Sequence, residues 1–291
     1  MKRRLKNSIA VLKIAFRGWW SRDPFRESAV IAYYSIFSLP GLLLVIVSFA
    51  GYFFGRNVVS RQIAEQITSM MGQETANEIQ DMIMQAGNNT HSTWVTLFGL
   101  VTIIIGATGV FAQFQQSLNT IWEVKTNASG SGVWYFIKVR LFSFGLIVAI
   151  AFLLIVSLIA SALLAAFGVF ISNHFSDSFL LLLQVANFIF SFLILMVLFA
   201  LMFKFFPGTK IRWQHVWIGS LVTTSLFEIG KLALGLYFGK ANPGIGYGAA
   251  GSVILILLWV SYSSMLVLFG AEFTHAYSIR HPTGKKPVSK P

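Results

Sequence analysis

The sequence contains no cysteine and very few charged residues. Without cysteine the chain forms no disulfide, and it offers no thiolate nucleophile or Cys-ligated metal site. Charged residues make up 11% of the 291 positions, less than half of the roughly 25% found in ordinary soluble domains. Hydrophobic residues make up 56% and aromatic residues 15%. A surface with so little charge is poorly suited to water, so the composition predicts an integral membrane protein.

Acidic residues are the scarcer of the two signs, with 10 against 22 basic residues and a net charge of +12. Such an excess is typical of nucleic-acid-binding proteins, but also of membrane proteins whose inner connections are rich in lysine and arginine. Here the basic residues lie in the connections between apolar runs. We therefore expect membrane lipids, and not nucleic acid, as partners.

Six apolar segments are long enough to cross a bilayer, since about 20 helical residues span its ~30 Å hydrocarbon core. Strands of a membrane barrel would be shorter and would alternate in polarity, which these segments do not. The predicted fold is therefore all-α: a polytopic membrane helix bundle forming one domain over 1–278, followed by a disordered tail over 279–291. The approximate limits of the six spans are 28–54, 94–114, 141–171, 179–205, 213–238 and 248–271.

Lysine and arginine are distributed unequally between the two sides of these spans. Residues 1–27 hold eight of them, and together with the tail and the connections on the same side the number is 18, whereas the opposite connections hold three. Basic residues stay on the cytoplasmic side of inner membranes. The pattern predicts a multi-pass topology with both termini in the cytoplasm.

Two amphipathic segments lie outside the predicted spans. Near the N-terminus, Leu5, Ile9, Leu12, Phe16 and Trp19 recur at helical spacing beside basic residues. This pattern predicts a helix that either lies in the anionic membrane interface or packs on the bundle. A second amphipathic pattern, in the outer loop 56–92, predicts short helices that cap the outer surface: Val59, Ile63, Ile67, Met70, Ile79 and Ile83.

Several stretches resemble one known family. They are AYYSIFSLP at 32–40, FQQSLNTIW at 114–122 and YGAAGSVILILLWVSYSSMLVLFGAE at 247–272. These blocks are similar, in the same order, to those of the YihY/BrkB family, whose members were formerly labelled ribonuclease BN. The resemblance covers about residues 10–278. It implies a bacterial inner-membrane protein with six helices and a role in transport or in the cell envelope.

No catalytic pattern supports the ribonuclease label. The five histidines are scattered singly, and no HxHxDH or HExxH pattern that would hold a hydrolytic metal occurs. The GxGxxG match at 246–251 follows Asn242 and Pro243 and precedes a span, so it indicates a hairpin and not a dinucleotide site. We expect no enzyme activity, no catalytic residue, no metal and no cofactor.

The main candidates for function are polar groups within the spans. Glu228 and Lys231 lie three residues apart in the fifth span and share one helix face. Charges in hydrocarbon are costly, so the pair indicates either a polar pathway or a self-neutralising structural contact. Pro40 is expected to kink the first span, and broken helices often mark transport sites.

Further polar residues are secondary candidates. Gln113, Gln116 and Asn119 are spaced to line a cavity or to hydrogen-bond across helices, and so are Gln184 and Asn187. Glu272 ends the sixth span beside two small residues that allow another helix to approach closely, and we expect structural pairing with a nearby base. The candidates for that base are Arg212 and Lys204.

These features favour a transporter- or flippase-like protein for an envelope-related amphiphile or a small solute. Glu228, Lys231 and Pro40 would line its route, and Gln113, Gln116 and Asn119 would extend it. The alternative is a noncatalytic envelope scaffold or assembly factor whose outer helices bind a partner. GxxxG matches at 51–55 and 235–239 predict tight helix packing and are compatible with a homo-oligomer.

Overall fold

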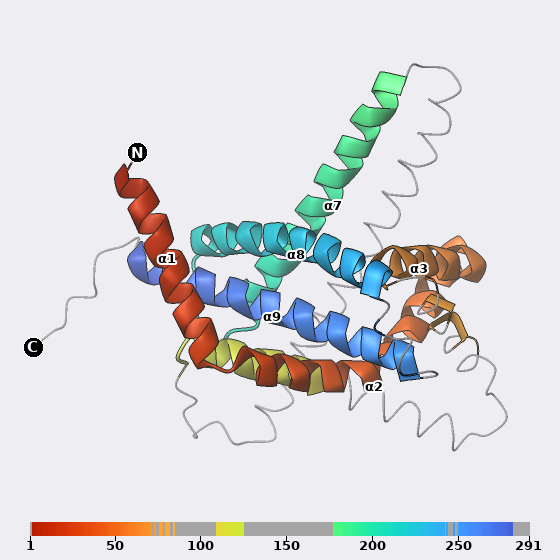
Figure 1. Ribbon diagram of the computed structural model, residues 1–291, viewed down its shortest axis with the longest axis horizontal. Coiled ribbons are helices and arrows are strands. Elements are labelled where there is room, and N and C mark those ends of the chain that lie inside the picture. The colour runs from red at the N-terminus through yellow and green to blue at the C-terminus, as the bar shows by residue number, and fades with distance from the viewer. Residues whose placement is uncertain are drawn as a thin grey trace, which may run out of the picture.

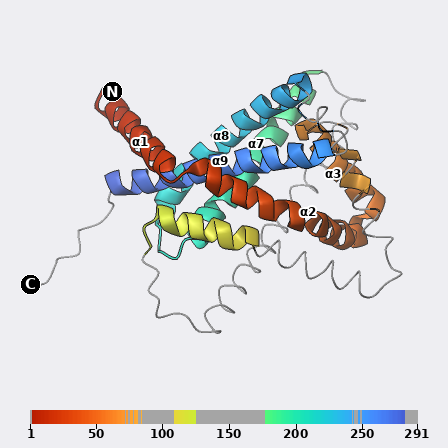
Figure 2. The same ribbon diagram turned by 60° about the horizontal axis from the view of Figure 1, so that its bottom comes forward.

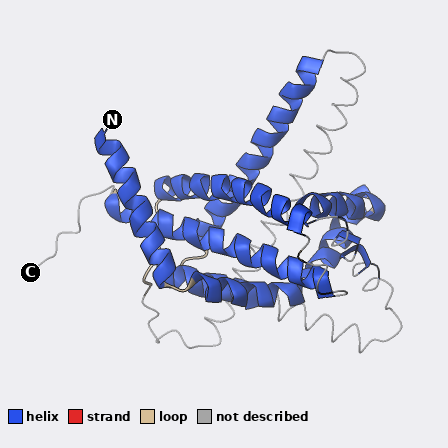
Figure 3. Cartoon of the chain, in the orientation of Figure 1, coloured by secondary structure: helices blue, strands red, loops and turns tan. Residues whose placement is uncertain are grey.

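The computed structural model describes most of the predicted bundle. All regular structure in the described residues is helical (Figure 3). The described residues are 2–71, 73, 76–77, 79–81, 84, 109–124, 177–241, 243, 247 and 250–281.

Six helices carry labels in Figure 1, and a further helical segment covers 109–121. The labelled helices are α1 (Lys2–Ser21), α2 (Pro24–Phe54), α3 (Arg56–Met71), α7 (Asp177–Phe205), α8 (Trp213–Ala241) and α9 (Gly251–Arg280).

Three segments in the described part of the chain are long and apolar enough to cross a membrane: Val185–Phe205, Trp213–Ala241 and Gly251–Arg280. They coincide with the predicted fourth, fifth and sixth spans. Helix α2 contains the predicted first span and continues through Pro40 without a break. The kink expected at Pro40 stays a prediction. The number of six spans also stays a prediction, because 141–171 and most of 94–114 lie outside the described residues. The tail after 281 lies outside them too.

Helix α9 lies between α2 and α8, and α1 crosses its C-terminal end obliquely (Figures 1 and 2). The first and last described residues therefore lie at the same end of the bundle. The main core joins several elements through fully buried side chains, among them Ile31 of α2, Leu118, Phe203 of α7 and Val216 of α8. Burial of these apolar groups packs the helices around α9.

Helices α8 and α9 approach each other through a reciprocal glycine–threonine arrangement. The Cα of Gly219 faces Thr274, and the Cα of Gly270 faces Thr223, so each threonine fills the space over a glycine on the other helix. Each threonine hydroxyl donates to the carbonyl four residues back in its own helix, at 2.8 Å for Thr223 and 2.7 Å for Thr274. The close approach predicted beside Glu272 is confirmed, and its partner is α8.

The two GxxxG matches do not serve this purpose at their second glycines. Gly55 ends α2 with a φ of 86°, a left-handed conformation that favours glycine, and Gly239 faces open space. Neither glycine has a neighbour within 4 Å of the position where a Cβ would lie. Tight packing is therefore not seen at Gly55 and Gly239 within the described chain, and for the two GxxxG matches as a whole it stays a prediction.

Helix α1 has two apolar faces. Val11 and Ala15 are buried against Ala276 of α9. Ile9, Leu12 and Phe16, the residues that suggested an amphipathic helix, are exposed on the other side. The structure thus confirms a helix at the N-terminus and shows that one face packs on the bundle. Of the residues predicted from the spacing, Trp19 packs on α9, whereas Ile9, Leu12 and Phe16 do not belong to the packed face.

Helix α3 lies at the opposite end of the bundle from α1. Its buried Val59 packs with Val47 of α2 and Phe238 of α8. A helix in the predicted outer loop is therefore confirmed over Arg56–Met71.

Candidate functional site

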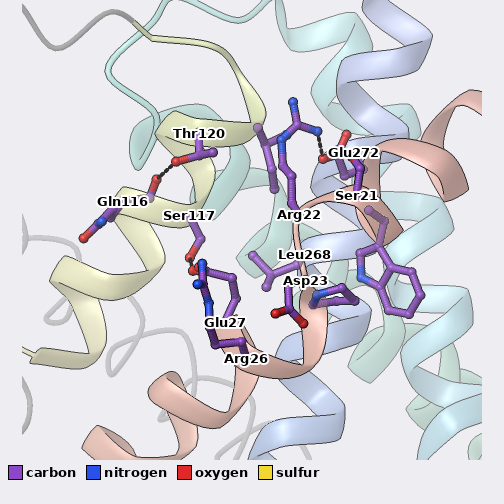
Figure 4. A pocket seen from close by; sticks show the side chains of 13 residues that line it. Ser21, Arg22, Asp23, Arg26, Glu27, Gln116, Ser117, Thr120, Leu268 and Glu272 are labelled. Atoms are coloured by element: carbon purple, nitrogen blue, oxygen red, sulfur yellow. Dashed lines mark hydrogen bonds and ion pairs between the residues drawn. The ribbon is translucent and has the colours of Figure 1, made fainter.

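A cavity of about 460 Å³ with a mixed polar and apolar lining lies where α1 turns into α2 (Figure 4), and we call it the corner cavity. Its walls come from the end of α1, the start of α2, the 109–121 helix and the C-terminal half of α9. Its lining is mainly charged, hydroxyl-bearing or amide-bearing, with four apolar side chains. The lining residues are Trp19, Ser21, Arg22, Asp23, Pro24, Arg26, Glu27, Gln116, Ser117, Thr120, Ile121, Leu268 and Glu272.

The turn between α1 and α2 shapes one wall of the corner cavity. Asp23 adopts a left-handed conformation with a φ of 51°, and Pro24 follows as the first residue of α2. Proline suits this place because the first turn of a helix needs no N–H donor there. This sharp turn directs Arg22 toward α9 and Glu27 toward the 109–121 helix.

Glu272 is the most deeply buried charge at the corner cavity, with 4% of its side chain exposed. The guanidinium of Arg22 pairs with its carboxylate and hydrogen-bonds to it. Gly18 of α1 makes room for the carboxylate, because a Cβ at this glycine would lie 2.6 Å from Glu272 Oε2. Arg22 also lies 3.8 Å from the exposed Glu123, so the corner joins α1, α9 and the end of the 109–121 helix.

Glu27 forms the second polar contact of the corner cavity. Its Oε2 accepts hydrogen bonds from Gln113 Nε2 at 2.8 Å and from Ser117 Oγ at 2.6 Å, and its Oε1 lies 3.4 Å from Arg26. Hydrogen bonds to a carboxylate are stronger than those between neutral groups. Glu27 therefore fastens α2 to the 109–121 helix beside the corner cavity.

The lining carries charge of both signs. Two arginines, Arg22 and Arg26, face three carboxylates, Asp23, Glu27 and Glu272. Part of this charge is already neutralised by contacts within the protein, while the exposed Asp23 and the 71%-exposed Arg26 side chain lie at the solvent side. Such a site suits a polar or zwitterionic group better than a purely apolar one.

The structure brings together only some of the residues predicted to form a polar route. Gln116 lines the corner cavity, Gln113 donates to Glu27, and Asn119 accepts from the backbone N–H of Gly208 at 2.7 Å. The interhelical hydrogen bond predicted for this group is confirmed for Gln113, whereas Asn119 bonds to the connection between α7 and α8. A role for these residues in a route stays a prediction.

Glu228 and Lys231 form an ion pair of 2.7 Å on α8, as their spacing predicted, but neither lines the corner cavity. Between them, Gly230 lies against Tyr262 and Leu266 of α9. The pair is partly buried, with 17% of the Glu228 side chain and 32% of the Lys231 side chain exposed. Both expected roles, in a route or as a self-neutralising contact, stay predictions.

The remaining candidates lie in α2 and α7. Asn187 is half-buried and interacts with another group of the protein. The backbones of Pro40 and Gln184 are described as helical, but their side chains are not described.

The predicted partners of Glu272 are wrong. Arg22, at the opposite end of the sequence, pairs with it, and Lys204 instead donates to the carbonyl of Ile211. Sequence reasoning also missed Glu27, although a lone glutamate among the eight basic residues of 1–27 was a usable signal. Within the described residues, no group of three or more His, Asp or Glu side chains is placed to hold a metal ion.

Three helices long and apolar enough to cross a membrane, within the described part of the chain, are typical of an α-helical integral membrane protein. The sequence matches the family described as Virulence factor BrkB over residues 15–291, and the chain belongs to this family. The resemblance in the sequence blocks is thereby confirmed.

Several relatives share this membrane assignment. A UPF0761 membrane protein of Saccharophagus degradans is 26% identical over 258 residues, which cover 88% of this chain and 56% of that protein. A UPF0761 membrane protein of Cronobacter sakazakii is 27% identical over 84% of this chain and 80% of its own. The chain thus spans little more than half of some relatives.

One relative carries a different kind of name. YfkH of Bacillus subtilis strain 168, named as a ribonuclease-like protein, is 23% identical over 97% of this chain and 99% of its own. No solved structure matches the chain.

Proposed function

We propose that the protein is a transporter- or flippase-like, non-enzymatic protein of the bacterial inner membrane that moves an envelope-related amphiphile or a small solute. The corner cavity is the observation that carries this proposal, because it places groups of both charges at one end of an apolar bundle. Charged groups near hydrocarbon are costly and commonly mark substrate or ion pathways.

The proposal places the corner cavity on the cytoplasmic side. Helix α1 and the turn into α2, which carry the eight basic residues of 1–27, lie at the same end of the bundle as the C-terminal end of α9 (Figure 1). Both observations support an arrangement in which the two termini face the cytoplasm. Substrate would then enter or leave through the corner cavity.

A cavity-filling substitution tests this function. Thr120 is exposed and lines the corner cavity, so Thr120→Trp is expected to lower flux at least several-fold in proteoliposomes. The readout is the rate at which a headgroup-labelled fluorescent phospholipid becomes accessible from the opposite leaflet, with a trapped fluorescent zwitterion as the solute arm. Leu236→Trp on the exposed face of α8 is the matched control and should leave flux unchanged. Wild-type flux equal to that of protein-free liposomes in both arms would reject the proposal.

The Glu228–Lys231 pair gives a second test of the route. If the route passes α8, Glu228→Gln lowers flux several-fold, because the carboxylate is lost from the path and Lys231 is left without its 2.7 Å partner. The neutral double variant Glu228→Gln/Lys231→Gln separates a role in the route from a structural role. It leaves no unpaired charge on α8, but it still lacks the carboxylate that a route through Glu228 would require. Restored flux in the double variant would show that the pair is structural.

The second candidate function is that of a noncatalytic envelope scaffold. It is favoured by α3, which packs through Val59 but keeps Arg61 and Glu65 exposed at 73% and 63% of their side chains. A partner that binds this polar face would be retained by the wild type and lost after Arg61→Glu/Glu65→Arg. Such binding without any flux would favour the scaffold.

A further inference from the structure

The side of α1 that faces away from α9 is apolar and exposed. Ile9, Leu12, Phe16 and Trp20 are each between 45% and 59% exposed. At 100° per residue they fall within an arc of about 80° on the helix surface, while the buried Ala15 lies outside that arc. Helix α1 therefore has a second apolar face, which we call the outward face and define by these four residues. Nothing in the described part of the chain covers it.

Aromatic rings extend the outward face across the turn into α2. Phe16 and Trp20 stack with centroids 6.1 Å apart, and Trp20 meets Phe25 of α2 edge-to-face, also at 6.1 Å. Phe25 is 56% exposed. Tryptophan and other aromatic rings gather at the boundary between lipid and water. A row of exposed rings in this place fits that boundary better than it fits water.

Charge identifies the surface that fits the outward face. The segment 2–21 contains six lysine and arginine residues and no acidic residue. Lys13 and Arg17 are exposed and, by helical spacing, lie beside Trp20 at one edge of the outward face. An apolar face edged by cations is complementary to a leaflet with anionic headgroups, where apolar side chains enter and lysine and arginine meet phosphates.

We propose that the outward face of α1 docks into the headgroup layer of an anionic phospholipid leaflet. The helix is then held from both sides, by α9 through Val11 and Ala15 and by lipid through Phe16 and Trp20. Its oblique course across the end of α9 lets it lie along a membrane surface while α9 crosses the membrane (Figure 2). Because α1 leads directly into Arg22, lipid docking also steadies one wall of the corner cavity.

The absence of cysteine allows this docking to be measured on the full-length chain. Single cysteines at Ile9 and Phe16, with a control at the exposed loop residue Thr209, carry nitroxide spin labels in proteoliposomes containing phosphatidylglycerol. Collision with oxygen reports lipid, and collision with a water-soluble nickel chelate reports water. We expect the labels at Ile9 and Phe16 to be at least several-fold more accessible to oxygen relative to nickel than the label at Thr209.

Two further comparisons test the charge and the occupant. Replacing phosphatidylglycerol by phosphatidylcholine should shift both α1 labels toward nickel, and Lys13→Gln/Arg17→Gln should abolish the difference between the two lipids. Nickel accessibility at Ile9 and Phe16 equal to that at Thr209 in both lipids would overturn the proposal. So would spin–spin broadening that disappears on dilution with unlabelled protein, because a second copy would then cover the outward face. None of these outcomes depends on transport.

Discussion

Arg22→Met is expected to destabilise the protein more than any other single loss of charge at the corner cavity. It removes the partner of Glu272, whose side chain is 4% exposed, and leaves that carboxylate buried without compensation. Removing one member of a buried ion pair costs about 3–5 kcal/mol, and we expect the lower end of this range because Arg22 itself is 26% exposed. The measurement is the unfolding of the detergent-solubilised protein, followed by tryptophan fluorescence.

Two further variants separate the effect of the unpaired Glu272 carboxylate on stability from the loss of packing by the Arg22 side chain. Glu272→Gln should cost less than Arg22→Met, because the arginine that remains can be hydrated from the corner cavity whereas the glutamate cannot. The double variant Arg22→Met/Glu272→Gln should recover part of the loss. Arg26→Gln is the matched control, since its 71%-exposed, 3.4 Å pair with Glu27 should contribute less than about 1 kcal/mol. Equal losses for Arg22→Met and Glu272→Gln would contradict the account of a buried pair.

The class of the protein and its helices could be predicted from hydrophobicity because lipid solvation demands long apolar segments wherever the chain crosses. The pairing of side chains could not. Glu272 was correctly expected to need a base, but Arg22 lies 250 residues away from it in the sequence, and spacing carries no information at that range. The charge pattern predicts Lys204 and Arg212 on the cytoplasmic side with Glu272, but it predicts Arg22 there too and does not single out the partner.

The corner cavity was hidden for a similar reason. Its lining comes from three parts of the chain, near residues 19–27, 116–121 and 268–272, and only the fold brings them together. The spacing of Gln113, Gln116 and Asn119 showed that one helix face is polar, but not which element meets it. Conversely, the pair Glu228–Lys231 was predictable because both residues lie on one helix, where i, i+3 spacing sets the distance.

Gly270→Ala is expected to force α8 and α9 apart. The added methyl carbon would lie 2.9 Å from both Cβ and Cγ2 of Thr223 and closer still to its hydroxyl oxygen. Rotation of the threonine gives no relief, because its Cβ is fixed to the backbone of α8. Overpacking of this kind costs about 1–3 kcal/mol. The loss should appear in the same tryptophan-fluorescence unfolding measurement, and Gly219→Ala should behave alike because its Cβ would lie 2.8 Å from Cβ of Thr274.

Gly239 serves as the control because no described group lies near the position of an added Cβ. It separates the loss of packing from the higher helix preference of alanine over glycine. Gly239 of α8 has nothing within 4 Å of an added Cβ, so Gly239→Ala should be neutral or stabilising by up to about 1 kcal/mol, the helix preference of alanine over glycine. Thr223→Ala combined with Gly270→Ala removes the hydroxyl and the methyl that clash, and should restore part of the stability. Equal effects at Gly239 and Gly270 would mean that α8 and α9 do not depend on this contact. A selective loss of stability at Gly270, with recovery by Thr223→Ala, would show that the glycine–threonine contact sets the spacing of α8 and α9. This spacing in turn fixes the position from which α9 presents Glu272 to Arg22.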